Sequence, residues 1–485
     1  MSVGPPALPA LLPALVGAFL ADRDGLAGAL AHHGTPVHLI FPQVFDENVR
    51  ALRAVLDRER VRYRMFYAHK ANQSAALALT ARRAGIGIDV ASPGELDSAT
   101  RAGFAPEKIE VTGPKGEAFT RIALQTGVTI NVDNLWELDL IDRITRAERP
   151  GGDPVAVLLR VGELPGTPFS RFGIPLALID RALTTLASAG SRIRLLGFAF
   201  HLDSGAVGDR VRAAQTCLGL IERAHARGLA PTVIDIGGGL RQVFTADADR
   251  FDAYVRALRE GLAGRGEPLA WAGHTFGYHI ESGATHGTPV FHKYGNTVTA
   301  ADMLAELLAA ELPEHDHRPL ARVLADNLLE LWLEPGKALV DHAGVTVAGV
   351  EFTKELGDGT PLVHLDLSRD AVTPADQEVM VDPLVVPRSA PLTGPPAGVF
   401  FAGGLCLERD MVTNHRVHLP GLPRPGDLIV FPNTAAYHMD LSAAAASMRL
   451  PPRKVVVVGT ERGFRVDTDD GVLSGEHARE FPKES

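Results

Sequence analysis

Short apolar segments that alternate with helical segments constrain the fold of this chain most strongly. Eight of them have the composition of strands, at residues 64–68, 87–90, 109–111, 129–132, 155–161, 195–200, 232–236 and 329–333. Helical periodicity lies between most of these segments. Most of the strands are apolar on both faces, which is typical of parallel sheets covered by helices. The pattern predicts a parallel (β/α)8 barrel. A doubly wound open sheet is the alternative, and it would use fewer of the strands.

The pattern changes after Pro335, where short strands follow one another without full helices between them. These strands are predicted at residues 345–353, 362–367, 398–402, 427–431 and 454–459. They predict a C-terminal β domain. The chain then has three parts: an N-terminal leader with a strand that joins the β domain (1–45), the barrel (46–334) and the β domain (335–485).

A long insertion, at about residues 241–327, separates the seventh and eighth barrel strands. Its second part, residues 301–312, has the pattern of an amphipathic helix. We expect the insertion to form a lid or a part of a subunit interface. Its histidines, such as His274, His279 and His286, match no compact zinc spacing, so we expect no metal site.

The composition excludes several classes of protein. The formal net charge is −10 without a long basic block, so we expect no nucleic-acid partner. Two cysteines, Cys217 and Cys406, cannot build a disulfide framework and suggest a reducing, cytoplasmic location. No apolar run is long enough to span a bilayer, so we expect no membrane contact. Four prolines interrupt the apolar N-terminus and no basic residue precedes Arg23, which argues against a secretory signal.

Lys70 directly follows the predicted strand at residues 64–68, in the stretch Phe66–Asn72. Such a lysine places its amine at the C-terminal end of the strand, where barrel enzymes have their active sites. Partial desolvation would lower its pKa and favour the nucleophilic free amine. The alternative is an ordinary surface lysine at a strand end.

Three consecutive glycines, Gly237 to Gly239, follow the strand at residues 232–236. Backbone amides in such a loop can bind phosphate, and barrels often bind phosphate near their last strands. Adjacent glycines are not the spaced dinucleotide motif, so they do not indicate NAD. The alternative is a flexible turn.

Other strand ends and loops carry side chains that could take part in chemistry. His201 ends the strand at residues 195–200 and could stack on a flat cofactor, with Ser204 as a donor to phosphate. Glu334 ends the last barrel strand, where a carboxylate could pair with a pyridinium nitrogen. Cys406 and Tyr437 lie on loops of the β domain. Each could also be an ordinary structural residue.

Taken together, the order and types of these motifs resemble the fold type III (alanine racemase-like) pyridoxal-phosphate decarboxylases. This group contains the diaminopimelate, ornithine and arginine decarboxylases. The resemblance covers roughly residues 37–448. It implies a barrel that binds pyridoxal 5'-phosphate, a C-terminal β domain, an amino-acid substrate and a homodimer with shared active sites.

The resemblance also implies roles for individual residues. Lys70 would join the cofactor through an imine, His201 would stack on its ring, and Cys406 would reprotonate the carbanion left by carbon dioxide. Glu408 and Asp410 would line the substrate end. The implied cofactor-binding residues are Lys70, Asp89, His201, Ser204, Gly237, Gly238, Gly239, Glu334, Gly336 and Tyr437.

The sequence differs from the family pattern at three of these motifs. Leu407 follows the cysteine where the family has an acid, Ala199 replaces a histidine, and Asp203 replaces a glycine. The substrate is therefore open between a diaminopimelate-, ornithine- or lysine-like amino acid and an amino acid of specialised metabolism.

Three other functions compete with decarboxylation. A fold type III racemase or other lyase would share the cofactor, although racemases usually have a tyrosine in the place of Cys406. A pyridoxal-phosphate carrier would be a short single barrel without a β domain. A metal-dependent barrel hydrolase would use the histidines of the insertion.

Overall fold

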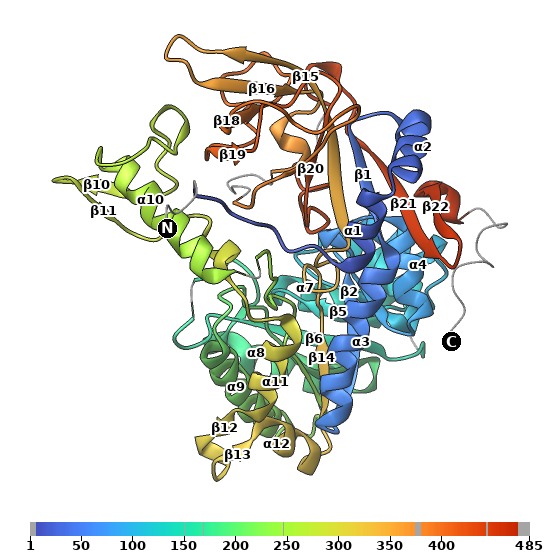
Figure 1. Cartoon of the computed structure of the whole chain (residues 1–485). Helices are drawn as coiled ribbons and strands as arrows, with labels where there is room; N and C mark the ends of the chain where they lie inside the picture. The colour runs from blue at the N-terminus through green and yellow to red at the C-terminus, as the bar shows by residue number, and fades with distance from the viewer. Residues whose placement is uncertain are drawn as a thin grey trace. The chain divides into compact units, whose positions relative to one another are not determined.

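The computed structural model describes residues 6–149, 151–167, 169–245, 247–373, 380–442 and 445–473. The chain divides into two compact units (Figure 1). Unit 1 comprises Met1–Phe45, Gln242–Thr299 and Val340–Val472, and unit 2 comprises Asp46–Arg241, Ala300–Leu339 and Leu473–Ser485. Within the described ranges, no helix combines the length and the apolar character needed to cross a bilayer.

Unit 2 contains a closed barrel of eight parallel strands, which confirms the predicted fold. The strands are β2 (Arg62–Ala68), β3 (Gly87–Val90), β4 (Ile109–Val111), β5 (Thr129–Val132), β6 (Val155–Gly162), β8 (Ile193–Ala199), β9 (Val233–Asp235) and β14 (Glu330–Leu333). They pair in the order β5-β4-β3-β2-β14-β9-β8-β6, and pairing of β5 with β6 closes the ring. A two-residue strand, β7 (Ile174–Pro175), extends the edge of β6.

Helices connect the barrel strands. They are α3 (Pro42–Arg58), α4 (Ala75–Arg83), α5 (Pro93–Arg101), α6 (Glu117–Thr126), α7 (Leu135–Glu148), α8 (Ile179–Ala189), α9 (Val207–His225), α11 (Ala300–Ala309) and α12 (Leu320–Asp326). A short hairpin of β12 (Glu311–Leu312) and β13 (Arg318–Pro319) lies between the last two.

Capping side chains end the loops that lead from barrel strands into helices. In each of three loops, a side-chain oxygen accepts a hydrogen bond from the backbone amide three residues later. The pairs are Ser74 with Leu77 at 3.2 Å, Ser92 with Glu95 at 3.1 Å and Asn134 with Glu137 at 2.9 Å. Such caps satisfy amides that have no partner within the helix. They fix where each helix begins, and so keep the loops after β2, β3 and β5 short at the end of the barrel where strands terminate.

Unit 1 is built around a second, mixed sheet. Its strands are β1 (Val37–Ile40), β15 (Gly344–Glu355), β16 (Pro361–Leu365), β17 (Leu384–Val386), β18 (Ala397–Ala402), β19 (Val417–Leu419), β20 (Leu428–Phe431), β21 (Arg453–Thr460) and β22 (Gly463–Thr468). β1 lies between β15, to which it is antiparallel, and β21, to which it is parallel. The N-terminal strand therefore joins the β domain. Before it come two helices, α1 (Ala14–Ala21) and α2 (Arg23–His33).

The segment predicted as one insertion is divided between the two units. Residues 242–299 form α10 (Ala248–Leu262) and the hairpin β10 (His279–Glu281) and β11 (Ala284–His286), which lies beside α10 (Figure 1). Phe251 and Tyr254 of α10 share a buried core with Val350 and Phe401 of the sheet in unit 1. The predicted amphipathic helix is α11, which packs on α9 in unit 2. Periodicity showed that residues 301–312 have a buried face, but it could not show that α9 buries it.

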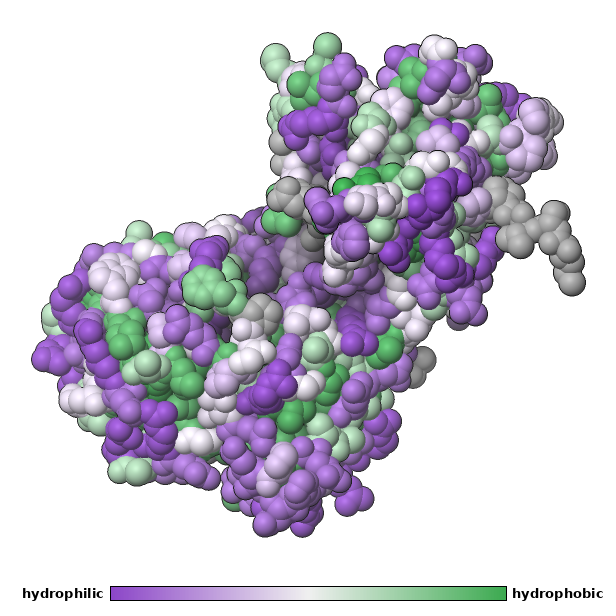
Figure 2. Space-filling view, turned by 90° about the vertical axis from the view of Figure 1, so that its left-hand side faces the viewer, coloured by the Kyte–Doolittle hydropathy of each residue, from purple (hydrophilic) through white to green (hydrophobic). Residues whose placement is uncertain are grey.

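The surface is predominantly polar where Figure 2 shows it, with apolar residues in small separate areas. Among the histidines of residues 242–299, His279, His286 and His292 are exposed. His279 and His286 pair across the β10–β11 hairpin and are exposed. In the described part of the chain, these histidines form no group of three possible metal ligands.

Candidate active site

Lys70 lies at the end of β2, in a short 3-10 turn from His69 to Ala71. The amide of Ala68 donates to the carbonyl of Pro335 at 3.2 Å, which joins this turn to the segment after β14. The lysine is half-buried and lines a cavity of about 580 Å³ in unit 2. Thr112, Arg160, His201 and Ser204 line the same cavity.

The three glycines after β9 form a tightly packed loop. Gly237 and Gly239 have φ values of +64° and +70°, a conformation that favours glycine. A Cβ on Gly238 would lie 2.5 Å from the carbonyl oxygen of Glu334, and one on Gly239 would lie 1.9 Å from that of Leu202. No larger residue fits this loop. The amide of Gly237 donates to Asp235 Oδ1 at 2.7 Å and that of Gly238 to His201 Nδ1 at 3.2 Å, so an anion at this loop would be bound by the amide of Gly239.

Arg210, on α9, binds this loop through its backbone carbonyls. Its guanidinium is fully buried and donates to the carbonyls of Leu202 at 2.5 Å, Gly238 at 2.7 Å and Ile236 at 3.2 Å. Burial lowers the pKa of Arg210 to about 10, which still leaves the side chain charged at neutral pH. Because this one cation binds one carbonyl just before the glycines and one within them, it helps to fix the conformation of the loop.

His201 is held as a neutral imidazole. The amide of Gly238 donates to its Nδ1 at 3.2 Å, which requires that nitrogen to carry a lone pair. Burial, followed by the positive charge of Lys70, lowers the pKa of His201 to about 3. The side chain nevertheless keeps 27% of its surface exposed, so part of the ring is open toward the cavity.

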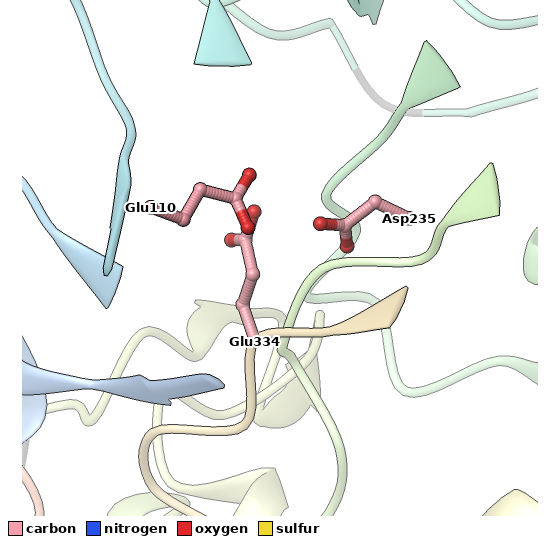
Figure 3. A group of neighbouring side chains, drawn as sticks. All are labelled: Glu110, Asp235 and Glu334. Carbon is pink, nitrogen blue, oxygen red and sulfur yellow. The ribbon is translucent and has the colours of Figure 1, made fainter. Parts of the chain in front are cut away.

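Buried acids occupy the barrel end beside these residues. Asp89, at the end of β3, accepts a hydrogen bond from Thr112 Oγ1 at 2.6 Å. Glu334 directly follows β14 and is 5% exposed. Burial and then the charge of Asp235 raise the pKa of Glu334 well above its usual range. Figure 3 shows the carboxyl group of Glu334 close to those of Glu110 and Asp235.

The remaining predicted residues of the barrel, Ser204 and Gly336, lie near the turn that carries Lys70. Ser204 is exposed, lines the cavity and accepts the amide of Ala206 at 3.3 Å. Gly336 follows Glu334, and a Cβ there would meet those of Ala71 and Ala68 at 3.0 and 3.1 Å. Lys337 forms an ion pair with Asp203. Unit 2 therefore brings together every predicted residue of the barrel.

Cys406 lies on an exposed loop of unit 1, between β18 and β19. Glu408 is also exposed. Asp410 is only 3% exposed, and its carboxylate accepts the amides of Leu405 at 2.7 Å and Arg369 at 2.8 Å. These contacts favour a role for Asp410 in shaping the Cys406 loop over the predicted contact with substrate.

Tyr437 also belongs to unit 1, in the loop after β20. Its φ is +65°, which is rare for an aromatic residue and is often retained at functional sites. Its carbonyl accepts the amides of Leu441 at 2.9 Å and Asp440 at 3.3 Å. The strained turn is thus closed by hydrogen bonds on its C-terminal side.

Sequence reasoning missed several polar residues of the barrel interior. Glu110, Asn131, Asp235 and Arg210 are at most 2% exposed, and Arg160 lines the cavity. Each of the first three stands between apolar neighbours in a short strand. A charged residue in the middle of such a strand was the available signal, because a buried charge requires partners.

The site fits pyridoxal 5'-phosphate on the strength of its own residues. A half-buried amine lines a cavity together with His201, and His201 contacts both a glycine loop that excludes any Cβ and the buried acid Glu334. They match the aldehyde, the phosphate and the ring nitrogen of that cofactor.

Comparisons with known proteins agree with this reading. Residues 44–275 match the family described as pyridoxal-dependent decarboxylase, pyridoxal binding domain. The chain is 35% identical over 416 residues to the uncharacterised protein y4yA of Sinorhizobium fredii, with 85% of each chain covered. It is 26% identical to a diaminopimelate decarboxylase of Methanothermobacter thermautotrophicus, with 88% of each covered.

Solved structures share the fold. The diaminopimelate decarboxylase from M. jannaschii in complex with L-lysine has a TM-score of 0.67 at 17% identity, with 94% of each chain covered. The arginine decarboxylase of Paramecium bursaria Chlorella virus has a TM-score of 0.65 at 18% identity and covers 90% of this chain and 100% of its own. The chain therefore belongs to the fold type III pyridoxal-dependent decarboxylases, and its cofactor is pyridoxal 5'-phosphate.

Proposed function

We propose that this enzyme removes the α-carboxylate of an amino acid, with Lys70 as the point of cofactor attachment and Cys406 as the proton donor. The observation that carries the proposal is the arrangement at one end of the barrel. There, Lys70 and His201 line one cavity, and His201 lies 3.2 Å from the amide of Gly238 and 4.0 Å from a carboxyl oxygen of Glu334. An amine, an anion-binding loop and a buried acid are the contacts that the cofactor needs.

Lys70 supplies the amine that binds the cofactor aldehyde. Asp89 faces it closely enough for its own pKa to be affected by the lysine charge, although burial is the larger influence and raises that pKa. The hydrogen bond from Thr112 holds one oxygen of Asp89 in place. We infer that Asp89 accepts and returns protons as the lysine amine is exchanged for that of the substrate.

Glu334 and His201 serve the ring of the cofactor. When bound, the cofactor supplies an electron-withdrawing ring system that accepts the electron pair left at Cα. Glu334 would hold a proton between its carboxyl group and the ring nitrogen. The imidazole of His201 would stack on the face of the cofactor ring. Because the imidazole is neutral, it would not compete with the positively charged pyridine ring for the nearby carboxylates.

The phosphate end would be formed by the glycine loop, a hydroxyl and a cation. The amides of Gly237 and Gly238 donate to Asp235 and His201, so the loop would offer the amide of Gly239, while Ser204 and Lys337 add a hydroxyl and a positive charge. Gly336 leaves room beside Ala68 and Ala71. Tyr437, in its strained turn, would provide a phenol to the same phosphate.

The reaction releases carbon dioxide and takes up one proton at Cα. The exposed thiol of Cys406 is the group proposed to give that proton. We further propose a homodimer in which the Cys406 loop of each subunit completes the barrel site of the other.

The substrate is a separate question. Two relatives of known structure are an arginine decarboxylase and a diaminopimelate decarboxylase in complex with L-lysine, and both names point to basic amino acids. In this chain, however, Leu407 stands where the family usually has an acid after the cysteine. We therefore propose a substrate whose side chain differs from that of ornithine.

The test is a screen of amino acids, in both stereochemical forms, for release of carbon dioxide by the cofactor-loaded enzyme. One amino acid should release carbon dioxide in proportion to amine formed. Racemisation without carbon dioxide release would contradict decarboxylation and support the racemase alternative. Lys70→Ala should lose the visible absorbance of the bound cofactor, whereas Cys406→Ala should keep it and lose turnover.

The dimer proposal has its own test. Lys70→Ala and Cys406→Ala subunits are mixed under conditions that allow subunit exchange. Shared sites predict that activity reappears, because a mixed dimer contains one site with both intact residues. Two inactive variants that stay inactive in a verified mixed dimer would contradict sharing.

A further inference from the structure

Glu110 is a buried acid of the barrel interior to which the chemistry described so far assigns no role. It lies in the middle of β4 and is 0% exposed. Oxygen atoms of Glu110, Asp235 and Glu334 all lie within 4.8 Å of one another, and Figure 3 shows the three carboxyl groups turned toward a common point. Three ionised carboxylates at such distances, with so little water, would repel one another strongly.

Few hydrogen-bond donors of the protein reach this cluster. Asn131, on β5, donates from one amide nitrogen to Glu110 at 3.0 Å and to Glu334 at 3.3 Å. The amide of Gly237 donates to Asp235 at 2.7 Å. Any contact between two of the three carboxyl groups needs a proton on one of them, because an ionised carboxylate only accepts. Asn131 is therefore the donor that joins Glu110 to Glu334.

Charged neighbours influence the pKa values of the three acids. Lys70 and Arg160 act on Glu334 as positive charges, while Asp89 adds a negative charge near all three acids. Burial, and then the charges of Asp235 and Glu334, raise the pKa of Glu110 well above its usual range. Burial raises the pKa of Asp235 to about 7, against the effect of the Gly237 amide. Glu110 and Glu334 are thus both biased toward their protonated forms.

We propose that Glu110 is a positioning residue that stays a neutral acid and, with Asn131 and Asp235, fixes the orientation and the charge that Glu334 presents to the cofactor ring nitrogen. The inference rests on the proposed pairing of Glu334 with that nitrogen. Glu110 itself does not touch the cofactor. It acts by donating its proton within the cluster and by accepting from Asn131, so that the negative charge of the acids is limited and held in one place.

The main test compares Glu110→Gln with Glu110→Leu. Glutamine keeps a neutral side chain with one donor and one acceptor, whereas leucine removes both. The readout is the absorbance spectrum of the bound cofactor between pH 6 and 9. We expect Glu110→Gln to match the wild type. Glu110→Leu should shift the midpoint of the spectral titration by about one pH unit or more, a tenfold change in proton affinity. Asn131→Leu should shift it in the same way if the leucine variant of Glu110 fails to fold.

Three results would overturn the proposal. Wild-type spectra in Glu110→Leu and Asn131→Leu, with only a lower melting temperature, would reduce Glu110 to a packing residue. A Gln variant that titrates like the Leu variant would mean that Glu110 is ionised. Binding of Mg²⁺ or Ca²⁺ that Glu110→Gln abolishes would mean that the acids form a cation site, which requires ionised carboxylates.

A second readout uses the protein without cofactor, so that it does not depend on the proposed function. A folded-state pKa raised above the unfolded value gives stability that is lost as pH rises through the folded pKa. The wild type should therefore lose more stability than Glu110→Gln between pH 5 and 8, measured by urea unfolding. Equal losses would contradict a neutral Glu110. If the wild type fails to bind the cofactor, the proposed function fails, while this measurement still decides the state of Glu110.

Discussion

The backbone amide of Gly238 donates to Nδ1 of His201 at 3.2 Å. This contact joins the glycine loop after β9 to the histidine after β8, and so links the predicted phosphate end of the site to the predicted ring face. It also sets the tautomer, since Nδ1 must accept and only Nε2 can carry a hydrogen in the neutral ring. This hydrogen bond therefore orients the imidazole, while burial and the charge of Lys70 keep it neutral.

Two substitutions of His201 separate stacking from hydrogen bonding. His201→Phe keeps a flat ring but cannot accept from Gly238, whereas His201→Asn can accept but cannot stack. If stacking is the main contribution, Asn should weaken cofactor binding about tenfold, in line with about 1.4 kcal/mol for an aromatic pair, and Phe less. Cofactor titration followed by absorbance gives both dissociation constants. The reverse order would show that the hydrogen bond matters more than the ring.

Arg210→Met should damage both the fold and the phosphate site. It removes a buried cation that binds three carbonyls around the glycine loop. Hydrogen bonds to a charged group contribute about 1.5–3 kcal/mol each, so unfolding in urea should show a loss of at least about 2 kcal/mol. The control is Arg223→Met on the same helix, where the arginine is 40% exposed and pairs with Asp180 on the surface. Equal effects of the two variants would contradict the role of Arg210.

Much of the barrel could be predicted because buried parallel strands are short runs of apolar residues in the sequence. Residues 87–90, 109–111 and 129–132 were predicted as strands at the bounds that the structure has. The fate of residues 242–299 could not be predicted in the same way. Aromatic residues such as Phe251 and Phe276 are buried in a core that also contains residues of β15, β18 and β20, which come much later in the sequence.

The residues of the site also fall into those that could be predicted from the sequence and those that could not. Residues that end a strand or form a glycine loop, such as Lys70 and Gly238, could be found because strand ends in a barrel share one face. Glu110 and Arg210 could not be assigned, because their importance depends on which groups surround them. A buried arginine on an amphipathic helix looks like a surface arginine until the carbonyls that it binds are known.

Lys337 and Asp203 make a testable pair at the phosphate end. Lys337→Met should weaken binding of pyridoxal 5'-phosphate about tenfold, the equivalent of roughly 1.4 kcal/mol, and leave binding of pyridoxal unchanged. Asp203→Asn should tighten binding of the phosphate form, because the lysine loses its competing partner. Titrations of the apoenzyme with the two compounds measure both effects. Equal weakening of pyridoxal would mean that Lys337 does not act on the phosphate.

Acid should destabilise the protein through His38 in the sheet of unit 1. This histidine is 1% exposed, contacts Thr346 Oγ1 at 2.9 Å, and has its pKa lowered to about 3 by burial and then by Lys454. The unfolded chain takes up the proton near pH 6.5, so the stability is complete above that pH and is lost as the pH falls toward 3. Between pH 6.5 and 5 the loss is about 2 kcal/mol, at about 1.4 kcal/mol per pKa unit.

The measurement is urea unfolding at both pH values for the wild type, His38→Gln and His279→Gln. His38→Gln should lose less stability on acidification than the wild type. His279 is 74% exposed, so its variant should lose as much as the wild type. Parallel acid losses in all three proteins would contradict a buried, neutral His38.

The covalent attachment of the cofactor at Lys70 is the claim on which the catalytic account depends. It is tested by loading the enzyme with pyridoxal 5'-phosphate, reducing it with borohydride and mapping the modified lysine by mass spectrometry. The account predicts one stoichiometric adduct on the peptide that contains Lys70, and none in Lys70→Ala. An adduct on Lys337 or Lys115 instead, or no adduct on a loaded enzyme, would contradict it.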